Sequence, residues 1–305
     1  MIERRDDGFL HGKIDVGGVS LHVAQARPRT KDGAVDDGST DVAADVPLIV
    51  FMHGFPEFWW SWHDQLRAFA DAGYWAVAPD MRGYNESDKP ESVSDYRVEK
   101  LAGDIDGLVR ALGRKTAIIV GHDWGGMAAW SVAELFPEMV TKLAILNVPH
   151  PAQMTRGLMT PQQLAKSWYI FFFQLPFGIP ERSLEADDYA IMRKTFAVDG
   201  FTPEHIEPYI TAIKTPGALT AAMSWYRAAV RRTFAFDPPK AVVIHCPVLV
   251  IWGDKDRHLG IELAVPPTKW VPNARVEHIP DAPHWVQSMA PERVNELLLA
   301  FARER

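Results

Sequence analysis

The strongest constraint on the fold is a repeated alternation of short apolar runs with helical patterns. The run 117–120 (AIIV) is apolar throughout, as expected for a strand covered on both faces. Apolar residues spaced three or four apart from Val98 to Leu112 predict a helix, which Gly113 ends. Further apolar or β-branched runs occupy 47–52, 75–78, 142–146, 248–252 and 275–279. This alternation predicts an α/β fold with a mostly parallel sheet and helices on both faces.

The alternation is interrupted between residues 148 and 241. Thr160-Pro161 and Thr215-Pro216 each combine an N-cap residue with a proline at the first helical position. Aromatic side chains are dense in this stretch, as in WYIFFF at 168–173. We therefore predict a helical cap domain at 148–241, inserted into a core domain formed by 1–147 and 242–305.

The N-terminal part contributes a hairpin and a loop. Alternating stretches at 10–16 and 19–26 flank Gly17-Gly18, which predicts a β-hairpin. The Asp- and Gly-rich segment 28–45 has little apolar content, so we expect a surface loop without a chemical role.

Composition and motifs argue against several classes of function. The net charge of -7 disfavours a nucleic-acid or acidic-membrane partner. The single cysteine, Cys246, excludes an intramolecular disulfide and a cysteine-based metal cluster. The sequence has no HExxH, paired HxH or Gly-rich phosphate loop, so we expect no metal and no cofactor.

Targeting signals are equally sparse. No apolar run approaches the ~18–20 residues of a bilayer span. The N-terminus lacks the apolar region of a signal peptide, so we expect a cytoplasmic location. The oligomeric state stays open, with a homodimer as one option.

The sequence GHDWGG at 121–126 directly follows the apolar run 117–120. Small residues around one central position are typical of a sharp strand-to-helix turn that presents a nucleophile. That position is Asp123, whose carboxylate would lie at a helix N-terminus, where the dipole keeps it ionised. The backbone N–H of Trp124 would help to stabilise an oxyanion there. The alternative, that Asp123 only caps the helix, leaves the small neighbours unexplained.

Polar residues also follow other predicted strands, whose carboxyl ends meet at one edge of a parallel sheet. Asp256 follows the run 248–252, and His284 follows the run 275–279. We expect Asp256 to orient His284, with Asp254 as the alternative acid.

The other histidines have weaker claims to a catalytic role. We expect His258 on a surface loop and His278 inside a strand. His53 and His122 precede the reactive turns, where they would hydrogen-bond loop backbone. His150 lies where the cap begins, and the sequence leaves open whether it lines a pocket.

Several motifs occur together: HGFPEFWWSW at 53–62, GHDWGG, the aromatic insertion, GDKD at 253–256 and a final histidine. In this combination they resemble the epoxide hydrolases of the α/β-hydrolase fold superfamily. Asp123, Asp256 and His284 follow the chain order of nucleophile, acid and histidine in that fold. In some members the acid follows the strand at 142–146 instead, where this chain has Asn147.

The resemblance implies a mechanism. Asp123 attacks an epoxide carbon and forms an ester, while Tyr169 and Tyr226 on the cap hold and protonate the departing oxygen. A serine would form an ether that water cannot readily cleave, whereas the ester carbonyl can be hydrolysed. His284 activates the water, and the N–H groups of Phe55 and Trp124 stabilise the oxyanion. The bond before Pro56 is cis in relatives.

The expected partners are a small lipophilic epoxide, which becomes a vicinal diol, and water. The residues expected to contact substrate are Phe55, Trp124, Trp168, Tyr169, Phe172, Trp225, Tyr226 and Trp285.

Two alternatives remain. A haloalkane or fluoroacetate dehalogenase would use the same nucleophile. However, Phe55 stands where many haloalkane dehalogenases carry a halide-binding Asn, and tyrosine O–H groups suit an alkoxide better than a halide. A catalytically silent binding protein of the same fold is the second alternative, although the sequence retains every part of the machinery.

Overall fold

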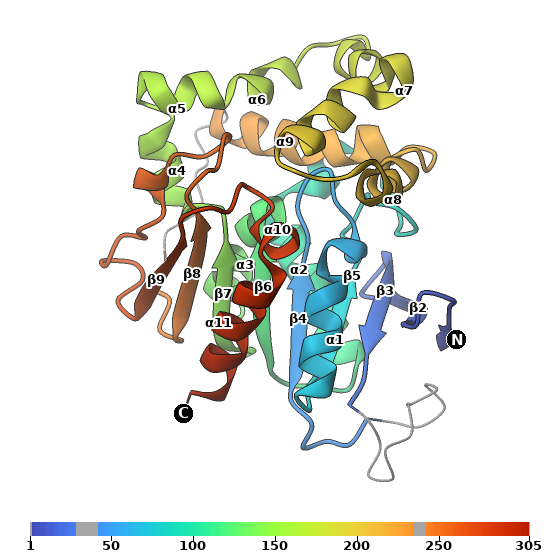
Figure 1. Cartoon of the computed structure of the whole chain (residues 1–305), viewed down its shortest axis with the longest axis vertical. Helices are drawn as coiled ribbons and strands as arrows, with labels where there is room; N and C mark the ends of the chain where they lie inside the picture. The colour runs from blue at the N-terminus through green and yellow to red at the C-terminus, as the bar shows by residue number, and fades with distance from the viewer. Residues whose placement is uncertain (1, 29–41, 235–241, 305) are drawn as a thin grey trace.

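A mixed sheet forms the centre of the molecule (Figure 1). The computed structural model describes residues 2–28, 42–234 and 242–304. The strands are β1 (Ile2–Arg4), β2 (Leu10–Asp15), β3 (Ser20–Ala26), β4 (Leu48–Met52), β5 (Trp75–Pro79), β6 (Ala117–His122), β7 (Val140–Leu146), β8 (Val248–Gly253) and β9 (Ala274–Ile279). Their order is β1-β2-β3-β5-β4-β6-β7-β8-β9. The pairs β1–β2, β2–β3 and β3–β5 are antiparallel. The pairs β5–β4, β4–β6, β6–β7, β7–β8 and β8–β9 are parallel.

Helices cover both faces of the sheet and its carboxyl edge. They are α1 (His63–Asp71), α2 (Val98–Ala111), α3 (Asp123–Leu135), α4 (Pro151–Gly157), α5 (Pro161–Lys166), α6 (Trp168–Phe172), α7 (Ile179–Val198), α8 (Pro203–Ile213), α9 (Ala218–Phe234), α10 (Val286–Met289) and α11 (Pro291–Arg303), with 3-10 turns η1 (Trp59–Trp62), η2 (Val93–Tyr96) and η3 (Ile261–Leu263). α1 and α11 pack together on one face, and α2 and α3 on the other (Figure 1). α2 buries Leu101, Ile105 and Leu108, which are the residues of its apolar stripe.

The strand register brings the carboxyl ends of the central strands to one level. Met52 pairs with Gly121 across β4 and β6. His122 pairs with Leu146 across β6 and β7, and Leu146 pairs with Ile251 of β8. The segments that follow these strands therefore emerge side by side at one edge of the sheet.

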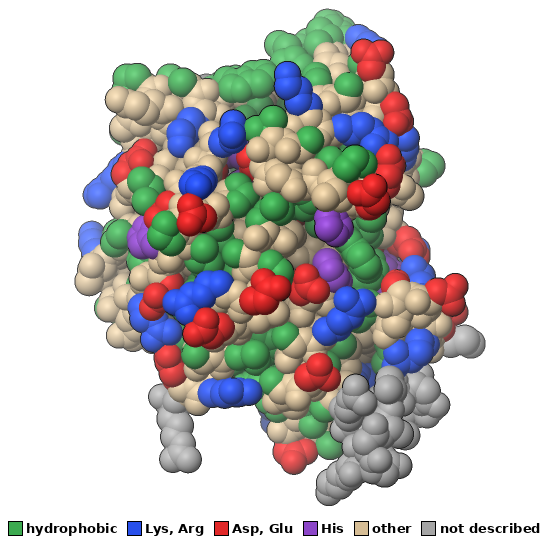
Figure 2. Space-filling view, viewed as in Figure 1, with side chains coloured by type: hydrophobic (Ala, Val, Ile, Leu, Met, Phe, Trp, Pro, Cys, Tyr) green, Lys and Arg blue, Asp and Glu red, His purple; other side chains and the backbone are tan. Residues whose placement is uncertain are grey.

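Helices α4 to α9 lie between β7 and β8 in the chain and cover this edge (Figure 1). α7 consists of two helical segments, because its backbone is not helical at 186–189. Figure 2 shows apolar side chains gathered over this end of the molecule, where Trp168 is 62% exposed. We retain 148–241 as a proposed cap domain; residues 235–241 lie outside the described part of the chain.

The predicted α/β class and strands are confirmed by β2 to β9, and the predicted helix by α2. Thr160 caps α5 by accepting a hydrogen bond from the Gln163 N–H. The helix start predicted at Thr215-Pro216 is wrong, because Gly217 has a φ of +80° and α9 begins at Ala218. Most of the predicted loop 28–45 falls on residues 29–41, outside the described residues.

Candidate active site

Asp123 lies at the turn between β6 and α3 with a φ of +49°, a left-handed conformation that is strained for a side chain. Its neighbours have no room for a Cβ. A Cβ on Gly125 would lie 2.2 Å from the Met52 carbonyl oxygen, and one on Gly121 2.5 Å from the Gly125 carbonyl oxygen. A Cβ on Gly54 would lie 2.4 Å from the Cβ of Asp123. These close approaches explain the small residues around Asp123.

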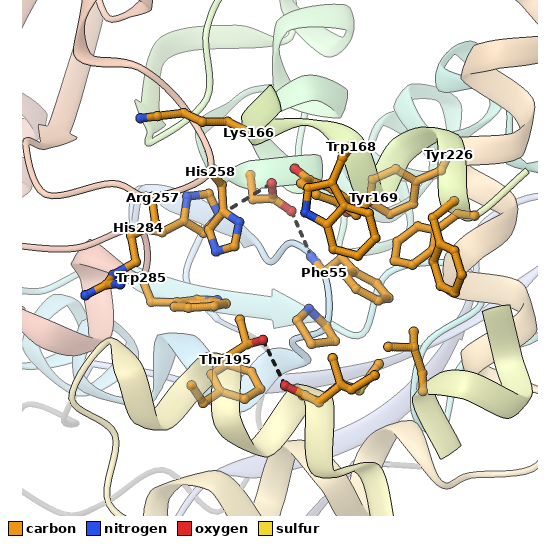
Figure 3. Close-up of a pocket in the computed structure, with 18 of the residues that line it drawn as sticks. Phe55, Lys166, Trp168, Tyr169, Thr195, Tyr226, Arg257, His258, His284 and Trp285 are labelled. Carbon is orange, nitrogen blue, oxygen red and sulfur yellow. Dashed lines mark hydrogen bonds and ion pairs between the residues drawn. The ribbon is translucent and has the colours of Figure 1, made fainter. Parts of the chain in front are cut away.

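The Asp123 carboxylate is held in its ionised form. Phe55 N–H donates to Oδ1 at 2.9 Å (Figure 3). Burial alone would raise the pKa of Asp123, but His284, His122 and the Phe55 N–H together lower it. The Phe55–Pro56 bond is cis, as the resemblance implied. Trp124 is the second residue of α3, so its N–H is one of the unpaired donors at the helix N-terminus.

His284 lies between two carboxylates. Its Nδ1 is 2.7 Å from Asp256 Oδ2, and its Nε2 is 3.6 Å from Asp123 Oδ2. Burial alone would lower the pKa of His284, but Asp256 and Asp123 raise it well above its ordinary value. Burial opposes ionisation of Asp256 too, yet His284 and Asn147 lower its pKa to about 2. The two carboxylates therefore favour the protonated form of the imidazole between them.

Asp256 is anchored through both carboxylate oxygens. Oδ2 accepts a hydrogen bond from Asn147 Nδ2 at 2.8 Å in addition to that from His284. Oδ1 accepts from the backbone N–H groups of His258 (2.7 Å) and Leu259 (2.9 Å). Asn147 directly follows β7 and orients the acid through this hydrogen bond.

A buried network connects the loops that carry these groups. Glu57 Oε2 accepts hydrogen bonds from the Gly54 N–H at 2.9 Å and from His122 Nδ1 at 2.7 Å. Glu57 Oε1 accepts from Gln287 Nε2 at 2.7 Å. His122 Nε2 lies 2.9 Å from the backbone oxygen of His284. The network ties the loop after β4, the turn at Asp123 and the loop of His284 to one another.

A cavity of about 500 Å³ brings core and cap residues together (Figure 3). Asp123 and His284 line it from the core, and Tyr169 and Tyr226 line it from α6 and α9. The two tyrosine rings lie 6.0 Å apart at an angle of 81°. Burial and the charge of Asp123 raise the pKa of both tyrosines, so their hydroxyls stay protonated. The cavity thus combines an ionised carboxylate with two phenolic proton donors.

The other predicted contact residues divide into two groups. Four of the predicted contact residues line the cavity, namely Phe55, Trp168, Phe172 and Trp285. The prediction is wrong for the side chain of Trp225, which is 1% exposed and donates from Nε1 to the Arg82 backbone oxygen at 3.0 Å. Trp225 and Tyr226 are neighbours on a helix, so they point about 100° apart and only one faces the cavity.

The side chain of Trp124 also lies outside the described wall, contrary to the prediction. Its ring packs against the ring of Tyr226 at 4.8 Å and that of Trp225 at 6.0 Å. Only its backbone N–H, beside Asp123, stays a candidate for contact with the reacting group.

His258 was not predicted to line the cavity. The sequence predicts a position on a surface loop for it, and this prediction is wrong. It lines the cavity, with its ring centroid 5.1 Å from that of His284 and 6.0 Å from that of Tyr169. Burial and the neighbouring His284 lower its pKa to about 4, so it is neutral near pH 7. The position of His258, two residues after the predicted acid Asp256, could have indicated that it lies near the site. Helix α7 also lines the cavity, for example with Leu184 and Met192. These contacts could not be predicted from the sequence, because an apolar helix face is equally typical of a helix packed in the hydrophobic core.

The remaining candidates lie apart from the chemistry. Asp254, the alternative acid, pairs with Nδ1 of His278 on β9 at 2.6 Å. His53 hydrogen-bonds backbone groups through both ring nitrogens, as predicted. His150 caps α4 and is not among the described wall residues.

The described residues contain no group of three or more His, Cys, Asp or Glu side chains arranged to hold a metal ion. None of the described helices has the length and apolarity that a membrane crossing requires.

Comparison with known proteins gives consistent matches. The family model of the alpha/beta hydrolase fold matches residues 47–291. The AB hydrolase superfamily protein YfhM of Bacillus subtilis is 40% identical over 304 residues, which cover 98% of this chain and 100% of that protein. Epoxide hydrolase 4 of Homo sapiens is 37% identical over 269 residues, covering 85% and 73% respectively. The crystal structure of Bacillus megaterium epoxide hydrolase in complex with an inhibitor matches with a TM-score of 0.83 at 28% identity, covering 96% of this chain and 100% of that chain.

Proposed function

This chain belongs to the epoxide hydrolases of the α/β-hydrolase fold superfamily, and we propose that it converts lipophilic epoxides to vicinal diols through an ester on Asp123. The observation that carries this mechanism is the shared cavity of Asp123, Tyr169 and Tyr226. An attacking carboxylate and a proton donor for the departing oxygen are the two groups that ring opening needs.

In the first step, a carboxylate oxygen of Asp123 attacks an epoxide carbon, and the bond from that carbon to the ring oxygen breaks. The oxygen stays on the neighbouring carbon and takes a proton from Tyr169 or Tyr226, which gives a hydroxyalkyl ester. The proton that His284 holds at rest then returns to the tyrosine oxygen. This transfer leaves His284 neutral and ready to act as a base.

Ester formation itself favours that change in His284. Alkylation removes the charge of Asp123, one of the two carboxylates that raise the pKa of His284. The neutral imidazole takes a proton from the water that attacks the ester carbonyl. The oxyanion forms on Asp123, where the N–H groups of Phe55 and Trp124 stabilise it. When the oxyanion collapses, the bond from the carbonyl carbon to the ester oxygen breaks. The departing alkoxide takes the proton of the hydroxyl group that came from water, which releases the diol and restores the carboxylate, while His284 keeps the proton it took from the water.

Product analysis tests this proposal. Incubation with styrene oxide or an aliphatic epoxide should yield the vicinal diol without any added cofactor. Bromoalkanes serve as the comparison, since a dehalogenase would release halide from them. Halide release without diol formation would assign the site to the dehalogenase alternative.

Acidification should make the ester accumulate. The pKa of Asp123 is lowered, so ester formation should persist as the pH falls through the ordinary titration range of a carboxylate. Hydrolysis needs neutral His284, and Asp256 still raises the pKa of that imidazole in the ester. Hydrolysis should therefore slow first as the pH falls. Acid quenching followed by intact-protein mass measurement gives the ester fraction, and a fraction that decreases with acidity would contradict this order.

Moving the acid from position 256 to position 147, directly after β7, should partly restore the rate of ester hydrolysis. Asp256→Asn should slow ester hydrolysis by up to about ten-thousandfold, because the amide favours the wrong tautomer of His284. Adding Asn147→Asp returns a carboxylate close to the original one, since Asn147 Nδ2 lies 2.8 Å from Asp256 Oδ2. Single-turnover hydrolysis rates compare the two variants. A double variant no faster than Asp256→Asn would show that position 147 cannot supply the acid.

The epoxide and water are the only partners that this mechanism requires. A cytoplasmic location stays a prediction from the sequence, and a homodimer stays one option for the oligomeric state.

A further inference from the structure

One glutamine of the cap links the loop of the catalytic acid to the helix of a cap tyrosine. Gln163 lies on α5 and is fully buried. Its side chain contacts the loop that follows β8, which carries Asp256 (Figure 1). It also contacts Ser167, the residue just before α6, which carries Tyr169. No step of the proposed mechanism uses Gln163.

The side-chain amide of Gln163 makes three hydrogen bonds. Oε1 accepts from the Gly260 N–H at 2.9 Å. Nε2 donates to the His258 backbone oxygen at 2.8 Å and to the Ser167 hydroxyl at 2.9 Å. The loop offers one donor and one carbonyl acceptor, and an amide answers both from the same planar group. A side chain without an amide would leave these buried backbone groups unpaired, which is costly.

The two bonds to the loop support the turn that orients Asp256. Asp256 Oδ1 accepts from the N–H groups of His258 and Leu259, so its carboxylate and the loop backbone hold each other in place. Gln163 engages the same loop from the cap side. Lys166, one turn later on α5, adds a bond from Nζ to the Asp256 backbone oxygen at 3.2 Å. Helix α5 thus fixes the loop conformation on which the orientation of Asp256 depends.

The third bond joins the same amide to the start of α6. Ser167 is buried, and its hydroxyl does not cap α6. Instead, the hydroxyl accepts from Gln163, whose backbone oxygen also accepts from the Ser167 N–H at 2.9 Å. Tyr169 follows two residues later and lines the catalytic cavity. The placement of Tyr169 is therefore tied to that of the acid loop.

We propose that Gln163 is a positioning residue, which sets both the orientation of Asp256 and the placement of Tyr169 for the reaction at Asp123. Gln163 is not among the described residues that line the cavity, so it acts through the groups that it holds. The inference rests on the proposed function, because Tyr169 serves ring opening and Asp256 serves ester hydrolysis. One side chain of the cap therefore affects both steps.

Gln163→Met tests this role, because methionine keeps the length and the unbranched shape but has no amide. Single-turnover rates of ester formation and of ester hydrolysis should each fall by up to about a hundredfold, as small displacements of reacting groups can cause. A purely structural role would lower the amount of folded enzyme and leave both rates per active site unchanged. Gln163→Asn, whose amide is one methylene shorter, should change both rates in the same direction and serves as the second variant if Gln163→Met does not fold.

The pH dependence of hydrolysis gives a further readout. Hydrolysis needs neutral His284, whose pKa is raised by Asp256. A less firmly held Asp256 raises that pKa less, so the pH of half-maximal hydrolysis should be lower in Gln163→Met than in the wild type. The substitution removes none of the other titratable side chains near His284, which are Asp123 (esterified in this state), His122, His258 and Asp199.

Two further variants make the test specific. Gln153→Met is the matched control, because Gln153 on α4 also joins cap to core, donating from Nε2 to the Val265 backbone oxygen at 2.9 Å. Its rates and its pH of half-maximal hydrolysis should equal those of the wild type. Ser167→Ala removes only the bond toward α6. It should slow ester formation by up to about fivefold, the effect of one hydrogen bond, and leave the pH dependence of hydrolysis unchanged.

The outcomes separate the positioning role from the proposed function. Wild-type rates and pH dependence in a folded variant at position 163 would overturn the positioning role while leaving epoxide hydrolysis intact. An equal loss in Gln153→Met would also overturn it, since any weakening of the cap would then suffice. An unchanged rate of ester formation in Ser167→Ala would overturn the link to Tyr169. If the wild type forms neither ester nor diol, the proposed function fails and the positioning role fails with it.

Discussion

Replacement of His284 by glutamine is expected to stop turnover at an ester on Asp123. The nucleophile keeps its Phe55 hydrogen bond, so ring opening by Asp123 should continue in His284→Gln. Hydrolysis loses the only base that faces both Asp123 and Asp256 among the described residues. We expect turnover to fall by about a hundredfold to ten-thousandfold. Intact-protein mass should rise by the mass of one epoxide, and peptide mapping should place that mass on Asp123.

Two controls make this experiment specific. Asp123→Ala should give no mass increase, alone or combined with His284→Gln, because the attacking oxygen is missing. The wild type should show the increase only transiently after rapid acid quenching. A stable adduct on any other residue would overturn the assignment of the nucleophile.

Removal of both cap hydroxyls should nearly abolish ring opening. Tyr169→Phe and Tyr226→Phe each retain the ring and its packing, so each should slow alkylation while one donor remains. The double variant leaves the departing oxygen without either donor, and a fall of about a hundredfold to ten-thousandfold is expected. The measurement is the single-turnover rate of ester formation, since steady-state rates also include hydrolysis.

Tyr209→Phe is the matched control for the cap tyrosines. Tyr209 is buried on α8, stacks on Phe196, and is not among the described residues that line the cavity. Loss of its hydroxyl should leave the alkylation rate unchanged. Full activity of the Tyr169/Tyr226 double variant would refute the role of these hydroxyls.

The positions of the three proposed catalytic core residues could be predicted because each follows a strand that local sequence defines. Asp123 follows an apolar strand and stands among glycines that leave no room for a Cβ. Asp256 and His284 follow β8 and β9, and the parallel register brings such strand ends to one edge. These features depend on backbone conformation and strand pairing, which short stretches of sequence encode.

The cavity wall could not be predicted to the same extent. Trp225 and Tyr226 are adjacent aromatics on one helix, and only the packing of α9 on the core decided which of them faces the cavity. The sequence around His258 is typical of a loop. Helices α4 to α9 cover that loop, so His258 lines the cavity and its ring lies near that of Tyr169.

The sequence by itself determined the α/β class, the turn at Asp123 and the order of the acid and the histidine. It could do so because apolar periodicity and the need for glycine act over a few residues. The tertiary structure alone decided that Asn147 orients Asp256 and that His258 lines the cavity. Those facts arise from contacts between segments distant in the chain, and their geometry exists only once the cap has packed over the edge of the sheet.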